Sequence, residues 1–257
     1  MDFLALCRQI LMLVALAACL WLLHLYSRVL PTAALVAVWV LLWLLLSRAL
    51  FLRARLRRQG WLAVYLRPQG SLSARLRGGL LMGLVQSVLG AGLAVLLLVA
   101  VMRSADPLIW MSLLSLALLL PVLSAILQRS LREQASDLYL GELAWRTASA
   151  VLGAVLLAVL TWHAFGVSYP DFGTVTLEQA VWHMVGLQQA RSEIALVALQ
   201  AAAAGDGLRL WLGQQLLPAP GTSLWQALGW ALLLAQEALF VWSYLLLCRV
   251  VVMCEER

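Results

Sequence analysis

The chain alternates between long apolar runs and short polar stretches. A helix that crosses a bilayer core about 30 Å thick needs about 20 apolar residues. Six runs meet this requirement: residues 10–26, 29–46, 79–102, 108–127, 147–167 and 224–247. The first run ends without a small-residue cleavage site, which favours a retained helix over a signal peptide. The pattern predicts an all-α integral membrane protein with six transmembrane helices.

A seventh run, residues 184–204, is interrupted by polar side chains. It contains Gln188, Arg191 and Glu193. A charged side chain such as Arg at the centre of an inserted helix costs about 2.5–3.5 kcal/mol on insertion scales. The apolar remainder, residues 194–204, is too short to span. We therefore expect an interfacial or re-entrant helix here.

The arginines are distributed very unevenly between the two sides of these spans. With the N-terminus inside, fourteen lie on the cytoplasmic side and four lie outside, namely Arg28, Arg103, Arg191 and Arg209. Cytoplasmic loops of membrane proteins carry the excess of basic residues. Both termini are therefore predicted to be cytoplasmic, in a bacterial-type inner membrane. The segments are residues 1–47, 48–78, 79–127, 128–146, 147–167, 168–223 and 224–257.

Composition supports this class. Of 257 residues, 64% are hydrophobic and 12% are charged, against about 45–50% apolar and about 25% charged in ordinary soluble domains. This excludes a soluble enzyme, a disordered chain and a disulfide-stapled secreted module. The four cysteines, Cys7, Cys19, Cys248 and Cys254, follow no zinc-binding spacing.

The cytoplasmic segment 48–78 is the most strongly charged part of the chain. It holds eight arginines and no acidic residue, with Arg53, Arg55, Arg57 and Arg58 clustered just before Trp61. One interpretation is an interfacial helix that binds anionic lipid headgroups. The other is a docking surface for a cytoplasmic protein such as an ATPase subunit. Nucleic acid is not expected as a partner, because no known binding fold fits in thirty residues.

Two further polar segments are expected to be helical. Residues 128–146 carry charges of both signs and predict an amphipathic cytoplasmic linker. Residues 168–223 predict an amphipathic helical hairpin on the outer face, between spans 5 and 6. Thr176 and Gln179 have the spacing of a capping box, which starts a helix. The glycines at 205 and 207 are expected to end that helix, with a shorter helix over residues 208–217.

Small residues mark where membrane helices approach closely. Gly79, Gly83, Ser87 and Ala91 recur at steps of four along the third run, which predicts a packing face. The second run, which contains Trp39 and Trp43, is interpreted as lipid-facing.

Glu237 lies near the middle of the last run, beside Gln236. A carboxyl group there is costly and is treated as a functional site by default. The hypothesis is a proton or pore site that includes Gln236 and Gln86. The alternative is a neutral Glu237 that hydrogen-bonds Gln86 or Ser87. An ion pair with a basic residue of the same chain is not expected.

The three histidines, His24, His163 and His183, all fall toward the outer side. A shared haem or metal site is the weaker hypothesis, because no motif spacing supports it. No cofactor is therefore predicted. No catalytic motif occurs either, so an enzyme acting alone is not expected.

Two resemblances of topology bear on function. Six spans, a basic loop after the second and an outer hairpin before the last resemble permease subunits of ABC-2 type exporters, to which residues 60–70 and the third span are loosely similar. That loop lacks the acidic residue usual in those exporters. The second half also resembles the pore half of a six-helix cation channel, although no selectivity-filter sequence is present.

From these features we expect a permease-like inner-membrane subunit of a multi-protein transport or export assembly. The alternatives are a non-catalytic anchor or scaffold subunit, a channel-like oligomer and a haem- or metal-binding subunit.

Overall fold

The structure is a computed structural model that describes residues 3–65, 80–133, 137–166, 170–216 and 224–255. The side chains of 59–65 and 224–236, and of a few residues at other helix ends, are not described. All regular structure in the described ranges is helical. The helices are α1 (Phe3–Tyr26), α2 (Thr32–Tyr65), α4 (Leu80–Arg103), α5 (Pro107–Leu131), α6 (Asp137–Gly166), α7 (Leu177–Gly186), α8 (Glu193–Leu216) and α9 (Leu224–Glu255).

Within the described residues, five helices contain a stretch that is long and apolar enough to cross a membrane. The stretches are Leu4–Tyr26, Thr32–Arg58, Met82–Arg103, Pro107–Leu131 and Tyr139–His163. Each overlaps one of the first five predicted spans, and the protein is a multi-pass, all-helical membrane protein. The sixth predicted span, residues 224–247, falls within α9 and stays a prediction.

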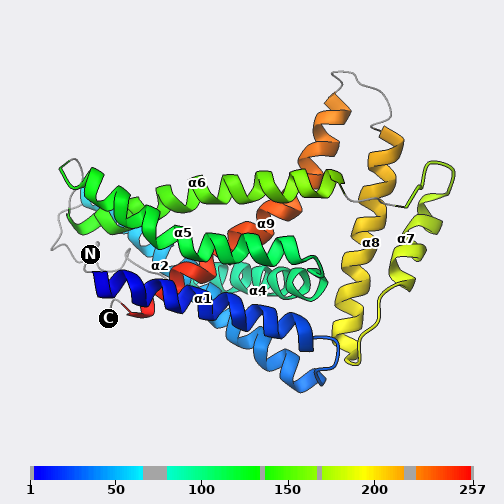
Figure 1. Ribbon diagram of the computed structural model, residues 1–257, viewed down its shortest axis with the longest axis horizontal. Helices are drawn as coiled ribbons and strands as arrows, with labels where there is room; N and C mark the ends of the chain where they lie inside the picture. The colour runs from blue at the N-terminus through cyan, green and yellow to red at the C-terminus, as the bar shows by residue number, and fades with distance from the viewer. Residues whose placement is uncertain (1–2, 66–79, 134–136, 167–169, 217–223, 256–257) are drawn as a thin grey trace.

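The long helices run antiparallel in a bundle (Figure 1). Both chain ends lie at one end of this bundle, which we call the terminal end. The pair α7–α8 lies at the opposite end, which we call the hairpin end. There α8 runs across the bundle axis instead of along it (Figure 1). A spanning helix would follow the axis, so α8 has the orientation expected of an interfacial helix.

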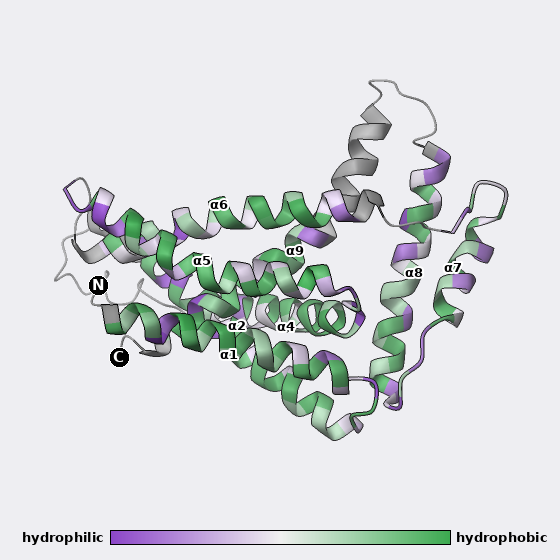
Figure 2. Cartoon of the chain, in the orientation of Figure 1, coloured by the Kyte–Doolittle hydropathy of each residue, from purple (hydrophilic) through white to green (hydrophobic). Residues whose placement is uncertain are grey.

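The second half of α9 occupies the centre of the bundle. Helix α9 contacts α1, α2, α4, α6 and α8, and Tyr244, Leu246 and Leu247 are fully buried. The Tyr244 hydroxyl donates a hydrogen bond to the carbonyl of Leu113 on α5, at 3.2 Å. The long helices of the bundle are largely hydrophobic in Figure 2, and many of their apolar side chains are exposed, for example Leu11, Leu44 and Val88. An apolar exterior is what a lipid environment requires.

Helices α2 and α4 pack closely along the predicted small-residue face. A Cβ at Gly90 would lie only 2.8 Å from the backbone of Ser47, so only glycine allows this approach. The carbonyls of Ser87 and Ala91 accept hydrogen bonds from Trp43 (2.8 Å) and Trp39 (3.5 Å). Gly83 faces Phe51 of α2, and Gly79 lies outside the described residues. The interpretation of the second run as lipid-facing is wrong for this side of α2, where Leu42, Leu46 and Ala49 are buried.

Two polar segments predicted to be separate from the spans are continuations of spanning helices. Helix α2 runs on through Tyr65 and so includes the first part of segment 48–78. Helix α5 extends to Leu131 and α6 starts at Asp137, which leaves no separate linker helix in residues 128–146. The reason is local: Arg, Leu and Glu are good helix formers, and no proline interrupts either stretch.

The hairpin end contains the predicted pair of helices but with a different turn. The capping box of Thr176 and Gln179 is confirmed at the start of α7. The chain turns at residues 187–192, and α8 continues through Gly205, Asp206 and Gly207. The predicted end of a helix at these glycines is therefore wrong. Gly207 is needed for packing: a Cβ there would lie 2.9 Å from the Cα of Val181 on α7.

Candidate functional site

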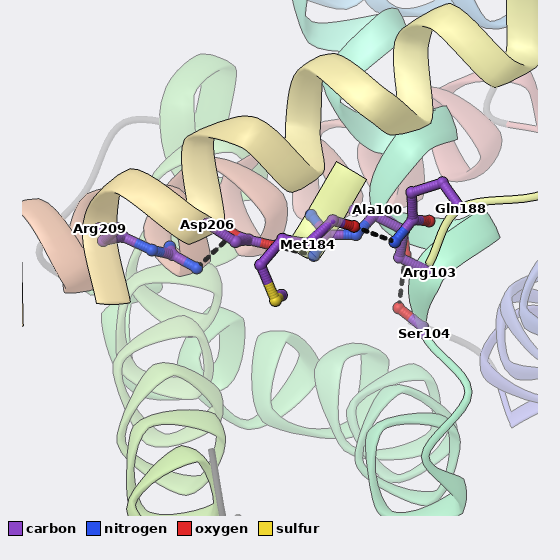
Figure 3. A network of polar contacts seen from close by, with 7 residues as sticks. All are labelled: Ala100, Arg103, Ser104, Met184, Gln188, Asp206 and Arg209. Atoms are coloured by element: carbon purple, nitrogen blue, oxygen red, sulfur yellow. Dashed lines mark hydrogen bonds and ion pairs between the residues drawn. The ribbon is translucent and has the colours of Figure 1, made fainter. Parts of the chain in front are cut away.

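Asp206 forms the centre of a polar cluster at the hairpin end. Its side chain is only 5% exposed and pairs with Arg103, the last residue of α4, and with Arg209, one turn later on α8. The distance from Arg209 Nη2 to Asp206 Oδ1 is 2.6 Å. Figure 3 shows Asp206 between the two arginines. Because Arg103 belongs to the bundle and Asp206 to the hairpin, this ion pair fastens α8 across the bundle end.

The sequence around Asp206 explains why it can reach this position. Gly207, the residue after Asp206, lets α8 approach α7 closely, as the short distance to Val181 shows. Aspartate is a poor residue for a helix interior, so tertiary pairing with Arg103 and Arg209 outweighs its local preference. A fully buried unpaired carboxylate would cost several kcal/mol. The two guanidinium groups remove that cost.

Glu237 is also part of this end of the molecule. Its carboxyl group is half-buried and lies within electrostatic range of Arg209 and Arg103. We expected no ion pair between Glu237 and a basic residue of this chain; Arg209 and Arg103 come within electrostatic range of it, and that expectation stays a prediction. Among the described residues, no hydrogen bond joins Glu237 to Gln86 or Ser87. The side chain of Gln236 is outside the described set.

The position of Glu237 is a long-range result of folding. The sequence predicts Arg103 in an outer loop and Arg209 in the outer hairpin, and the fold brings both within electrostatic range of Glu237 on α9. The sequence contains one indication that these two arginines have a specific role. They are two of only four arginines on the side of the spans that is poor in basic residues. The i, i+3 spacing of Asp206 and Arg209 also suits a pair on one helix face.

The three histidines each have a separate partner in the chain. His24 Nδ1 lies 2.9 Å from the carbonyl of Val101, and His183 makes an edge contact with Phe172. His163 Nε2 donates to a carboxylate oxygen of Asp106. Among the described residues, no three His, Cys, Asp or Glu side chains form a group that could hold a metal ion.

Asp106 joins two spanning helices at the hairpin end. Its carboxylate accepts a hydrogen bond from the backbone N–H of Leu108, at 2.9 Å, and so caps α5. That backbone hydrogen bond lowers the pKa of Asp106, and His163 on α6 lowers it further. The charged form of Asp106 thus ties the start of α5 to the end of α6.

A second charged cluster lies at the terminal end. Arg249 of α9 pairs with Glu142 of α6 at 3.1 Å, and its guanidinium group lies 5.0 Å from the centre of the Trp145 ring. Arg53 of α2 is half-buried and lies within electrostatic range of Glu142 and Arg249. The cluster therefore joins α2, α6 and α9 where they leave the apolar core.

The arginines predicted to dock a partner divide into two groups. Arg53 and Arg58 are half-buried, whereas Arg55 and Arg57 are exposed. The Trp61 side chain is outside the described set. Because Arg53 faces the Glu142 cluster, Arg55 and Arg57 are the members of the predicted set that are open to a partner or to lipid headgroups.

Comparison of the chain with protein-family models, with curated proteins and with solved structures gives no match. Its function is therefore argued from the geometry of the two ends of the bundle.

Proposed function

We propose that the chain is the inner-membrane subunit of a transport or export assembly, in which the α7–α8 hairpin covers the outer end of a six-span bundle. The observation that carries the proposal is the buried Asp206, which links this cover to Arg103 of the bundle. The cover is also held by a small apolar cluster, in which Ala195 and Leu199 of α8 pack against Leu35 of α2 and Met102 of α4, so its release would break both charged and apolar contacts at this end. Glu237 sits beside the charged contacts.

The orientation follows from charge. Ten of the described arginines lie at the terminal end and four lie at the hairpin end. The positive-inside rule places the richer end in the cytoplasm, with both termini there and the hairpin outside. Arg55 and Arg57 are then positioned to contact a cytoplasmic partner, for which an ATPase subunit is the expected class.

A non-catalytic anchor subunit is the second candidate. It is favoured by the core of the bundle, where one continuous apolar cluster includes residues of α1, α2, α4, α5, α6 and α9. A pore through a single copy would need a polar lining in its place.

Purification in mild detergent tests the docking part of this proposal. We expect a nucleotide-hydrolysing protein to co-purify in fixed ratio with the chain. The variant Arg55→Ser/Arg57→Ser is expected to lose it, because both side chains are exposed. The matched control is Arg129→Ser/Arg132→Ser, which removes two exposed arginines at the same end of the bundle, at the C-terminal end of α5. Retention of the partner by the Arg55/Arg57 variant would contradict docking through α2.

A second variant separates transport from anchoring. Glu237→Gln keeps the shape of the side chain but removes its charge beside Arg103 and Arg209. A transport role predicts that ATP hydrolysis by the assembly loses its coupling to transport, with normal expression. An anchor role predicts unchanged activity of the bound partner. Glu193→Gln, an exposed glutamate at the start of α8, is the control.

A further inference from the structure

A cavity of about 510 Å³ opens at the hairpin end, between the α1–α2 turn and the α7–α8 turn. Its lining is Arg28 from the first turn, and Gln188, Gln189, Ala190, Arg191 and Leu196 from the second turn and the start of α8. This volume is in the range of small-molecule sites, about 300–1,000 Å³. Gln188 also belongs to the polar network of Figure 3, where its amide donates to the carbonyl of Met184, whereas the side chains of Arg28 and Arg191 belong neither to the Asp206 cluster nor to the terminal cluster.

The two turns are joined by contacts that fix the two arginines around one opening. The backbone N–H of Arg191 donates to the carbonyl of Arg28 at 3.1 Å. The hydroxyls of Thr32 and Ser192 share a hydrogen bond of 2.9 Å. The pairing of Arg28 with Arg191 is therefore a result of the fold and not of two mobile surface chains meeting.

The charge of this cavity is uncompensated within the described part of the chain. Neither Arg28 nor Arg191 has an ion pair there, and no acidic residue belongs to the lining. Arg103 and Arg209, the other two arginines of this end, share Asp206. Two exposed guanidinium groups with glutamine amides beside them are suited to an oxyanion, and phosphate is the oxyanion that arginine binds in bidentate fashion.

Exposed apolar side chains next to the lining residues indicate where that phosphate comes from. Val29 is 61% exposed beside Arg28, Leu187 is 62% exposed beside Gln188, and Val197 is 65% exposed beside Leu196. A soluble anion would make no favourable contact with these apolar side chains. A phospholipid does, because its acyl chains lie against apolar side chains while its phosphate reaches the interface.

We propose that this cavity binds the phosphate of an anionic phospholipid, held jointly by Arg28 and Arg191. The acyl chains lie along the exposed apolar residues of the same two turns and of the start of α8. The bound lipid bridges the α1–α2 turn and the hairpin, and so stabilises the cover. The site stands independently of the transport role, and only its assignment to the outer leaflet rests on the proposed orientation.

Native mass spectrometry of purified protein incubated with phosphatidylglycerol or phosphatidylcholine tests the proposal. The first lipid is anionic and the second is zwitterionic, although both carry a phosphate. We expect about tenfold more retained phosphatidylglycerol than phosphatidylcholine, and at least a fivefold loss of this preference in Arg28→Gln/Arg191→Gln. Arg28→Lys/Arg191→Lys should keep part of it. Equal retention by the glutamine variant and the parent protein would overturn the site.

Two controls sharpen the result. Arg129→Gln/Arg132→Gln removes two exposed charges from the terminal end and should leave the preference unchanged. An equal loss there would mean that net charge, and not this cavity, selects the lipid. The second arm is inorganic phosphate added to delipidated protein. If phosphate alone raised the melting temperature as much as phosphatidylglycerol does and displaced the lipid, the site would take free anions and the lipid assignment would be wrong.

Loss of lipid in the Arg28/Arg191 variant with retention of the cytoplasmic partner keeps this inference separate from the docking proposal. Both substituted side chains are exposed, so the helix content and oligomeric size of the variant should match those of the parent. A variant that kept its lipid but lost its partner would contradict the present inference and leave docking to be judged by Arg55 and Arg57.

Discussion

At the scale of single residues, a buried charged side chain joins two helices at each end of the bundle. The Asp206 side chain is 5% exposed and the Arg249 side chain is 7% exposed. Each pairs with a residue on another helix, Asp206 with Arg103 and Arg249 with Glu142. Breaking a buried pair by removing one partner costs more than the pair contributes, because it leaves an uncompensated charge. These two residues are therefore the most sensitive positions to charge substitution.

Asp206→Asn tests this at the hairpin end. The change leaves Arg103 and Arg209 without their shared carboxylate. We expect a loss of about 3 kcal/mol in unfolding free energy, the lower end of the range for buried pairs, because the arginines are 25% and 17% exposed. Cleavage in the turn at residues 187–192 should also become faster, which limited proteolysis measures. Asp171→Asn, an exposed aspartate on the same side, should change neither quantity.

The Asp106 carboxylate predicts a dependence on pH. Its pKa is lowered in the folded protein by the N–H of Leu108 and by His163, from an ordinary value of about 3.9. A lowered carboxyl pKa stabilises the fold at pH values above the unfolded pKa, and the effect is lost as the pH falls through the lower folded value. The parent protein should therefore melt higher than Asp106→Asn at pH 5, and the difference should shrink as the pH falls below the ordinary carboxyl pKa. A constant difference would contradict this.

At the scale of elements, close helix contacts depend on particular glycines. Gly207 lies against the backbone of α7, whereas a Cβ at Gly205 would meet nothing within 4 Å. Alanine at 205 should stabilise α8 by about 0.5–1 kcal/mol. Alanine at 207 should destabilise the hairpin by about 1–3 kcal/mol, because backbone must move. Thermal melting of the two variants measures the contrast, and equal melting temperatures would mean that the hairpin is not packed as described.

The same contrast exists on α4. A Cβ at Gly90 would collide with Ser47 of α2, and one at Gly92 would meet nothing within 4 Å. Gly90→Ala is expected to separate α2 from α4 and lower the melting temperature, while Gly92→Ala is expected to be neutral or stabilising. A melting temperature for Gly90→Ala at or above the parent value would contradict the close packing of these two helices.

The features that could be predicted from the sequence are those with causes inside a single helix or its cap. The first five spans and the capping box at Thr176 were predictable because apolar runs and cap residues act locally. The continuation of α8 through Gly205–Gly207 was not, because its causes lie on α4 and α7. The high cost of a carboxyl group in a membrane marks Glu237 in the sequence, but Arg103 and Arg209, which lie within electrostatic range of it, are distant along the chain. The exposure of Arg55 and the burial of Arg53 likewise depend on how α2 meets α6 and α9.

At the scale of the whole molecule, the two ends are chemically different. The terminal end holds most of the described arginines, and the hairpin end holds the α7–α8 hairpin, the Asp206 cluster and the proposed lipid site. The proposed topology predicts how a membrane-impermeant maleimide reacts with intact cells. With the native cysteines replaced, Asp171→Cys should be labelled directly, and Glu133→Cys only after permeabilisation. Both native side chains are exposed. The reverse pattern would invert every assignment of inside and outside.

Helix α2 connects these two ends without a break. Between Thr32 and Arg57 it has neither proline nor glycine, and 26 residues of α-helix extend over about 39 Å. Its first residue, Thr32, hydrogen-bonds Ser192 at the foot of α8, while its far part carries Arg55 and Arg57. A stiff helix that is held at Thr32 passes a tilt of its arginine-bearing part to that end. In the proposed orientation, a force applied to Arg55 and Arg57 from the cytoplasmic side would reach Ser192, at the base of the hairpin, through one unbroken helix.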